Sequence, residues 1–353
     1  MDADCLKLTA YFGERKRAAD AFVADAMLDL FGRHEVATSI LLRGIEGFGL
    51  KHHLRTDSSP TLSEDLPAVA IAVDTRPRVE AMLDEAAATG SGLITLERAR
   101  MQVGTFEAAP LPEECKLTVY FGRQERVERR PAFVAVCDLL HWHGLTGAST
   151  LLGVDGTVHG RRERARFFAR NAEVPVMVVG VGSGAHIAEV LPELGSLLRE
   201  PLVTVERVRV CKLDGQLVEA PHELPATDEH GLAIWQKLMI HTSEAQLHDG
   251  LPIHRELTQR LRRAGASGTT VVRGIWGFHG AHAPHGDRLF QRGRHGPVVT
   301  IVIDTPDKIA GSFAIVDELT AEHGLVTSEM VPAMRAAAGE DDSGGFRLAR
   351  HDC

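Results

Sequence analysis

The sequence predicts an α+β protein made of three tandem copies of one β-α-β-β-α-β unit. The main evidence is a glycine-rich motif at residues 42–49 (LRGIEGFG) that returns at residues 272–280 (VRGIWGFHG). A degraded form lies between them, at residues 152–160 (LGVDGTVHG). In each form an apolar run leads into closely spaced glycines, which predicts a strand that leaves its sheet through a tight turn or bulge.

The sequence around the motif repeats at the same intervals, which distinguishes triplication from chance. Residues 7–13 (KLTAYFG) return 109 positions later at residues 116–122 (KLTVYFG), and an offset of 230 carries Lys7 to Lys237. The copies also close alike, and their closing segments are residues 93–97 (LITLE), 202–206 (LVTVE) and 325–329 (LVTSE). The register is therefore held over about 100 residues in each copy.

Each element of the first copy has its own local signal. Residues 6–12 alternate in polarity like a half-buried strand, and Asp74-Thr75-Arg76-Pro77 offers a cap and a proline for the start of the second helix. The other expected elements are a first helix spaced by Ala18, Phe22, Ala26, Met27, Leu30 and Phe31, strands over residues 38–43, 68–73 and 93–99, and an exposed loop over residues 50–66.

This order of elements is that of a split-βαβ, or ferredoxin-like, unit. We expect the three units to span residues 1–104, 114–212 and 233–335, joined by proline-containing linkers. The acidic, glycine-rich end of the chain, residues 336–353, is expected to be a disordered tail.

Composition narrows the class of protein. The chain has 353 residues, a net charge of -9 and no stretch near the roughly 18 apolar residues of a membrane span. The charge argues against a general polyanion-binding surface. The first residues lack the basic and apolar regions of a signal peptide, and the five cysteines include no Cys-x-x-Cys pair. We therefore expect a cytoplasmic protein with free thiols.

The two full glycine motifs resemble those of the DUF190 family, small bacterial domains of unknown function that are related to the nitrogen-regulatory PII proteins. Residues 62–67 (LSEDLP) and 92–97 (GLITLE) also resemble that family's pattern. The resemblance covers nearly all of the first copy, much of the third and the framework of the second. It implies a ferredoxin-like fold, trimeric assembly in PII-type relatives, and a role in sensing or regulation without catalysis. PII relatives bind effectors in clefts between subunits and present a long loop between their second and third strands.

Three PII-like units in one chain suggest an intramolecular pseudo-trimer, because assembly covers the sheet face and edges that a lone unit exposes. The three clefts need not be equivalent. The first and third copies keep the pattern Arg-Gly-Ile-x-Gly-Phe, whereas the second carries Leu152 in place of the arginine and Thr157 in place of the phenylalanine.

The glycine motif is the candidate site for a small anionic effector such as a nucleotide. Backbone N–H groups at such glycines can approach a phosphate or carboxylate, and the arginine adds charge. The candidate residues are Arg43, Gly44, Gly47, Phe48, Gly49, Arg273, Gly274, Gly277 and Phe278. The alternative is structural, with glycines that permit a positive φ at a bulge and phenylalanines that pack at an interface or in the core.

A histidine-rich loop in the third copy is the candidate metal site. His279, His282 and His285 follow one another at a spacing of three, with His295 beyond them. Imidazoles at such spacing can bind Zn²⁺ or Cu²⁺, and the PII-like CutA proteins lend this reading some analogy. A solvated polar loop is the alternative, because Pro284 and Gly286 make the segment irregular.

The remaining patterns give no enzyme signature and no cofactor. Cys137 lies on an apolar helical face, and the glutamates that end each copy, being present three times, are expected to be structural. The aromatic strand motif of an RNA-recognition domain is missing, so no nucleic-acid partner is expected. Some family members are encoded near fluoride-exporting membrane proteins, which hints at a transporter partner. An adaptor without any ligand is the third alternative.

Overall fold

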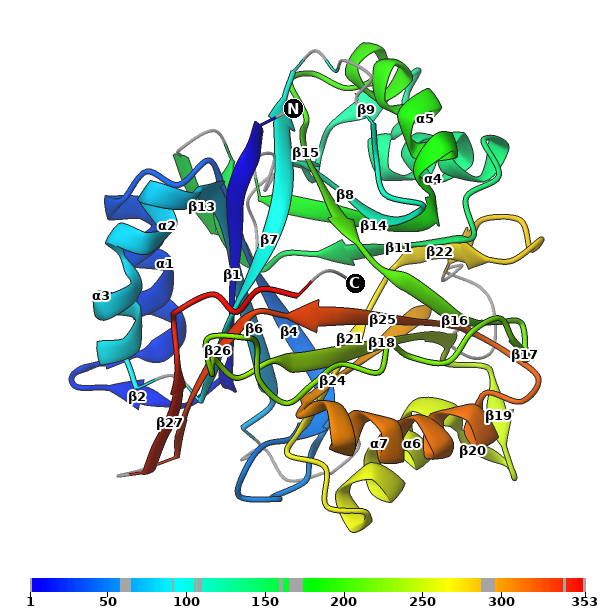
Figure 1. The fold of residues 1–353 in the computed structure, drawn as a ribbon. Helices are drawn as coiled ribbons and strands as arrows, with labels where there is room; N and C mark the ends of the chain where they lie inside the picture. Colours follow the sequence, from blue (N-terminus) through cyan, green and yellow to red (C-terminus); the bar gives the residue numbers. More distant parts are fainter. Residues whose placement is uncertain are drawn as a thin grey trace.

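The computed structural model describes residues 2–57, 65–90, 92–104, 106, 110–158, 161–164, 174–286, 296–338 and 341–351. These residues form a mixed α/β structure in which antiparallel strands pair at the centre and seven described helices lie around them (Figure 1). The helices gather in three groups, one for each repeat, with the paired strands between them (Figure 1).

The elements follow one another in the same order in each repeat. Repeat one contains β1 (Asp2–Gly13), α1 (Val23–Arg33), β4 (Thr38–Phe48), β6 (Pro67–Thr75), α2 (Arg76–Ala81), α3 (Leu83–Ala88) and β7 (Leu93–Val103). Repeat two contains β8 (Glu114–Gly122), α4 (Ala132–Trp142), β11 (Gly147–Leu152), β12 (Asp155–Val158), β14 (Pro175–Ser183), α5 (Gly184–Leu197), β15 (Leu202–Arg207) and β16 (Arg209–Leu213). Repeat three contains β18 (Trp235–Ser243), α6 (Ile253–Arg263), β21 (Thr269–Arg273), β22 (Trp276–His279), β24 (Pro297–Asp304), α7 (Pro306–Leu319), β25 (Leu325–Val331) and β26 (Ala333–Ala338).

Within a repeat the strand order is fourth, first, third, second, and every pair is antiparallel. In repeat one β7 pairs with β1, β1 with β6, and β6 with β4. The same order recurs as β15-β8-β14-β11 and as β25-β18-β24-β21. One face of each small sheet is covered by that repeat's helices, because apolar residues such as Met27, Leu30 and Phe31 point from α1 into the core.

Strands that run past their own sheet link the repeats in two closed cycles. The end of β7 pairs with β15, β16 pairs with β25, and β26 returns to pair with the start of β7. The end of β4 pairs with β21, β22 with β11, and β12 with the start of β4. Each repeat is therefore hydrogen-bonded to both of the others.

One expectation about the first repeat changes, and it concerns the start of the first helix. Ala18 and Phe22 precede the first helix, which begins at Val23, and belong to a two-residue hairpin formed by β2 (Arg17–Ala18) and β3 (Ala21–Phe22). Ala19 turns this hairpin at a φ of 49°, which ends the helical path that the apolar spacing suggests. The second strand leaves its own sheet at Gly44, as the glycine motif predicts. β4 pairs with β6 up to Arg43 and with β21 of repeat three from Gly44 to Phe48, with a shift of register between Gly44 and Glu46.

The end of the chain also differs from the expected disordered tail. β26 and β27 (Asp341–Gly345) form a hairpin, and β26 pairs with β7 over four residues from Ala333 to Ala336. Beyond the hairpin, the backbone N–H of Ala349 donates to the carbonyl of Pro332 (2.8 Å). The segment is acidic and rich in glycine, yet Ala336 packs with Ile303, and Ala349 packs with Leu224 and Ile234.

Candidate functional site

A closed ring of ion pairs lies where the three repeats meet. On each repeat's first strand a lysine stands opposite a glutamate of the fourth strand, and it also reaches the glutamate of a neighbouring repeat. In order around the ring the residues are Lys7, Glu97, Lys237, Glu329, Lys116 and Glu206. Each side chain contacts two of opposite charge, and the Lys7–Glu97 and Lys237–Glu329 contacts measure 2.8 and 3.1 Å. The ring therefore joins all three repeats by charge.

The ring is buried, and the opposite charges of its members work against the cost of burial. Burial alone would raise the pKa of the Glu97 carboxyl, but Lys237, Lys7 and Lys116 outweigh it and hold that pKa well below its usual range. Burial likewise works against the charge of Lys7, yet Glu206 and Glu97 raise its pKa above the ordinary value. At Lys116 burial outweighs the nearby Glu206 and Glu329 and lowers the pKa of the ammonium group. Three lysines alternate with three glutamates in the ring, so their formal charges cancel. Its glutamates are the ones that the repeated closing segments predict to be structural.

The glycine motifs lie at the seams where one repeat's second strand crosses onto another repeat. A Cβ atom on Gly47 would lie 2.4 Å from the carbonyl oxygen of Thr269, and one on Gly277 would lie 2.3 Å from that of Ala148. Neither glycine has a positive φ. Close approach of two backbones, and not the left-handed conformation that the structural alternative expected, therefore requires glycine at these two positions.

The two motif phenylalanines cross the seams into neighbouring cores. Phe48 of repeat one is 4% exposed and packs in the core of repeat three with Leu238 and Ile253. Phe278 of repeat three packs in the core of repeat two, edge-on to His141 at a centroid distance of 4.9 Å. The expectation that these rings serve the interface or core is confirmed. In repeat two the smaller Thr157 occupies the corresponding position.

The two motif arginines lie in equivalent ion pairs. Arg43 lies 3.0 Å from Glu14, and Arg273 lies 2.7 Å from Glu244, which is the residue corresponding to Glu14 230 positions later. Arg273 also reaches across the seam to Asp57, in the loop of repeat one, at 3.2 Å. The structure thus brings Arg273 together with groups from two repeats and keeps Arg43 within its own.

The seams differ in the residue that follows the first motif glycine by two positions. In repeat one it is the buried Glu46, 4.0 Å from Arg255 on α6, and burial raises the pKa of Glu46 to about 7. In repeat two it is Asp155, which binds Arg162 (2.7 Å). In repeat three it is Trp276, which packs against the repeat-two core. Aligning the three copies of the motif locates these positions in the sequence. It does not reveal their partners, because these come from other segments of the chain.

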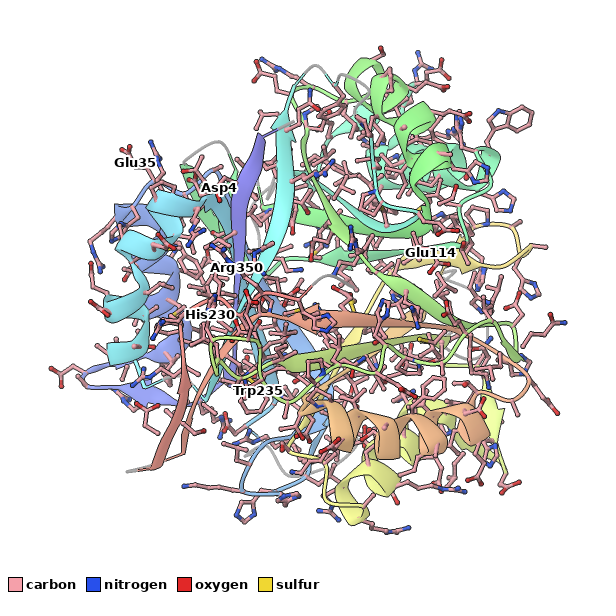
Figure 2. The ribbon with its side chains drawn as sticks, in the orientation of Figure 1. Asp4, Glu35, Glu114, His230, Trp235 and Arg350 are labelled. Atoms are coloured by element: carbon pink, nitrogen blue, oxygen red, sulfur yellow. The ribbon has the colours of Figure 1, made fainter. Side chains whose placement is uncertain are left out.

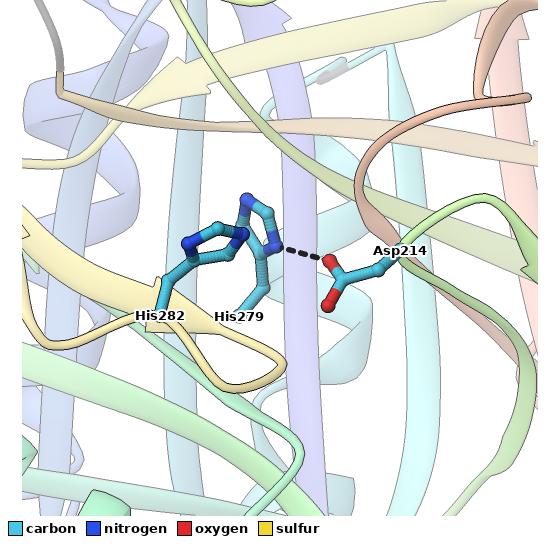
Figure 3. Close-up of side chains that lie close together, drawn as sticks. All are labelled: Asp214, His279 and His282. Carbon is cyan, nitrogen blue, oxygen red and sulfur yellow. Dashed lines mark hydrogen bonds and ion pairs between the residues drawn. The ribbon is translucent and has the colours of Figure 1, made fainter.

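The histidine loop forms a cluster with one residue that the sequence did not single out. His279 Nδ1 lies 2.7 Å from Asp214 Oδ1, and the ligand atoms of Asp214, His279 and His282 all lie within 4.8 Å of one another (Figure 3). Gln246 Nε2 lies 3.0 Å from the other ring nitrogen of His279. His285 instead contacts the carbonyl of Ala283 (3.1 Å), and His295 lies outside the described residues.

Asp214 comes from the hairpin turn after β16, in the segment that the sequence predicts as a linker. Nothing in its local sequence pointed to a histidine 65 positions away. Of the three predicted metal ligands, two therefore lie together with an unpredicted carboxylate.

Among the described residues, no helix is long and apolar enough to cross a membrane.

Comparison with known proteins returns the same threefold pattern. The model of the DUF190 family, described as "Uncharacterized ACR", matches residues 5–101, 114–210 and 235–333. A "UPF0166 protein" of Aquifex aeolicus (strain VF5) is 35% identical over 95 residues, which cover 27% of this chain and 88% of that protein.

Two solved structures are similar only distantly. One is an aspartate kinase from Synechocystis, with 12% identity and a TM-score of 0.25, over 95% of this chain and 45% of that one. The other is an unknown protein from Galdieria sulphuraria, with 12% identity and a TM-score of 0.18, over 62% and 97% of the two chains. Similarity at this level supports no inference about fold or function.

Proposed function

We propose, because the chain belongs to the DUF190 family in three tandem copies, that it is a regulatory protein of the PII-like kind and not an enzyme. In this proposal the three repeats are ferredoxin-like units that act as an intramolecular pseudo-trimer. The cyclic strand pairing and the six-membered ion ring support it, since each joins all three repeats in turn. A single chain then provides the seams that separate subunits would otherwise form.

The proposed effector is a small anion such as a nucleotide, bound at the seam between repeats three and one. The observation that carries this is the contact of Arg273 with Asp57, because it spans the seam and ends on the long loop of repeat one. An anionic group that binds Arg273 competes with Asp57 for the same guanidinium. Effector binding would then release the loop, and a partner protein, such as a membrane transporter, could read that change.

The competition explains why the two arginine sites should differ. Arg43 is 55% exposed and held by one carboxylate, whereas Arg273 is 26% exposed and lies between two. Repeat two has Leu152 at this position, so we expect it to have the weakest site. No more than two sites should fill strongly.

Thermal shift with ATP, ADP, AMP, citrate and phosphate tests this proposal, because a ligand that binds only the folded state raises Tm. Arg43→Ala and Arg273→Ala should each weaken binding roughly ten- to a hundredfold, the worth of a charge-assisted hydrogen bond. Arg33→Ala is the matched control, since Arg33 is an exposed arginine paired with Glu85 (2.7 Å) away from the motif. Lower stability in the two motif variants with no anion binding in any form would contradict the proposal.

A second candidate function is binding of a divalent metal, as in CutA-like proteins, and the Asp214–His279–His282 cluster favours it. A carboxylate that orients a metal-binding imidazole is a common arrangement. Zn²⁺ or Cu²⁺ would then bind with submillimolar affinity through the imidazoles of His279 and His282, with Asp214 orienting His279. Calorimetry on wild type and on His279→Ala/His282→Ala separates this site from a polar loop. His248→Ala, which alters a histidine outside the cluster, is the control.

A further inference from the structure

One side chain of repeat three, Gln246, contacts the second ring nitrogen of the histidine at the centre of the metal cluster. Gln246 lies in the turn between β18 and β19 (Leu247–His248), and its Nε2 atom is 3.0 Å from His279 Nε2. On the other side of the ring, His279 Nδ1 lies 2.7 Å from Asp214 Oδ1. Both ring nitrogens of His279 are therefore occupied, in a residue that is only 8% exposed.

Separate segments of the chain build this arrangement. β17 (Gln216–Leu217), which follows Asp214, and β22, which ends at His279, lie on the same side of the molecule, with side chains packed between their ribbons (Figures 1 and 2). Gly280 makes room for the carboxylate, because a Cβ atom there would overlap Asp214 Oδ2. The contacts of His279 thus belong to the packed fold.

The direction of each hydrogen bond in this chain of groups follows from the backbone. The N–H of Ser243 can only donate, and it donates to Oε1 of Gln246 (2.9 Å). The amide of Gln246 therefore turns its Nε2 towards His279, and an amide nitrogen also can only donate. His279 Nε2 must accept, so the ring proton lies on Nδ1 and is donated to Asp214.

This network opposes a metal ion at either nitrogen of His279. A metal at Nε2 needs the lone pair that accepts from Gln246. A metal at Nδ1 moves the ring proton to Nε2, where it would face the N–H group of Gln246, so that two donors oppose each other. Turning the amide over does not remove the conflict, because its nitrogen would then face the N–H of Ser243. A metal can bind His279 only after the side chain of Gln246 has moved away.

We propose that Gln246 competes with a divalent metal for His279 and so sets the affinity of the cluster, a proposal that rests on the second candidate function above. In the absence of metal, the amide of Gln246 satisfies the imidazole. When a metal binds, the imidazoles of His279 and the exposed His282 hold it, and Asp214 keeps the first ring in place. The observed affinity is then lower than that of the two imidazoles alone, because a hydrogen bond must first break.

Calorimetry of the full chain with Zn²⁺, on wild type and on Gln246→Ala, tests this competition. Alanine removes the donor and leaves space for the ion, so Kd should fall roughly two- to tenfold, the worth of one neutral hydrogen bond. Gln216→Ala is the matched control, because Gln216 is an exposed glutamine of β17, two positions after Asp214, and Kd should not change there. Weaker or unchanged Zn²⁺ binding by Gln246→Ala would overturn the proposal.

Nitrogen-15 NMR of the histidine rings in the wild-type chain gives a second readout, which needs no metal. The proposal requires His279 to carry its proton on Nδ1 when no metal is added. A proton on Nε2 of His279 would overturn it, whatever the affinity for Zn²⁺.

The two experiments separate failure of the metal site from failure of the competition. No Zn²⁺ binding by wild type or by Gln246→Ala would overturn the metal function and the competition together. Zn²⁺ binding that needs His279 and His282 but does not tighten in Gln246→Ala would overturn the competition alone.

Discussion

Lys237 Nζ of the third repeat lies 2.6 Å from Glu97 Oε2 of the first, and this contact closes the ring of ion pairs between the end of the chain and its beginning. The two residues are 140 positions apart in the sequence. Both side chains are 4% exposed. The contact makes the association of repeats one and three depend on a charge pair that solvent does not screen.

Removing one member of the ring should destabilise the protein strongly. Lys237→Met would leave Glu97 and Glu329 with an uncompensated buried charge, at a cost of roughly 3–5 kcal/mol in the free energy of unfolding. Denaturant unfolding measures this loss. Lys308→Met is the control, because Lys308 is 52% exposed and lies 3.7 Å from Asp304, a buried carboxylate that keeps hydrogen bonds from the backbone N–H groups of Ser267 and Thr305. A similar small effect of both changes would mean that the ring contributes little.

The glycine motif should tolerate alanine at one position and not at another. Gly47→Ala would place a methyl group 2.4 Å from a backbone oxygen of repeat three, whereas nothing lies within 4 Å of the corresponding point on Gly49. We expect Gly47→Ala to lower stability by roughly 1–3 kcal/mol, as overpacking does, and Gly49→Ala to have little effect. Tm of the two variants decides the matter, and equal values would remove the close-approach explanation.

Truncating Phe48 should damage a repeat to which it does not belong. Phe48→Ala would leave a cavity in the core of repeat three and cost roughly 3–5 kcal/mol. Phe22→Ala, at a phenylalanine that is 42% exposed, is the comparison. Hydrogen exchange should then show faster exchange at Leu257 and Leu261 of α6 in the Phe48 variant. If only amides of repeat one lost protection, the seam packing would be wrong.

The pH dependence of stability should carry a signature of Glu46. Its pKa is raised to about 7 in the folded protein by burial, above the ordinary 4.5. The folded state therefore holds this proton more tightly, so stability is fullest below about pH 4.5 and falls as pH rises towards 7. Glu46→Gln should remove that fall, on the order of 2–3 kcal/mol between pH 5 and 8. Glu14→Gln is the control, and an identical pH profile in wild type and Glu46→Gln would exclude the effect.

The sequence predicts most of what lies within a repeat and little of what lies between repeats. The three family copies and the order of their elements followed from offsets and polarity patterns, and the family comparison agrees with them. The repeated lysines and glutamates were visible as well. Their pairing was not, because a ring such as Lys237 to Glu97 depends on how separate units assemble, and no local period encodes that.

The errors have equally local causes. Ala18 and Phe22 kept a helical spacing by chance, since a turn at Ala19 precedes the helix. Asp214 lies in a turn whose polar residues look like any linker, and only the fold carries it to His279. Glycine spacing predicted a change of strand path but could not distinguish a positive φ from close backbone approach, because both require the absence of a Cβ atom.

The most direct measurement of the proposed effector site is the affinity of an anionic effector for Asp57→Asn. Because Asp57 competes for Arg273 in the free protein, removing its charge should tighten binding of the nucleotide or other anion that the thermal shift identifies. Arg273→Ala should weaken it, so the two changes on either side of one 3.2 Å contact act in opposite directions. We expect Kd to fall for Asp57→Asn and to rise roughly tenfold or more for Arg273→Ala. Unchanged or weaker binding by Asp57→Asn would contradict the proposed release of the loop by an anion.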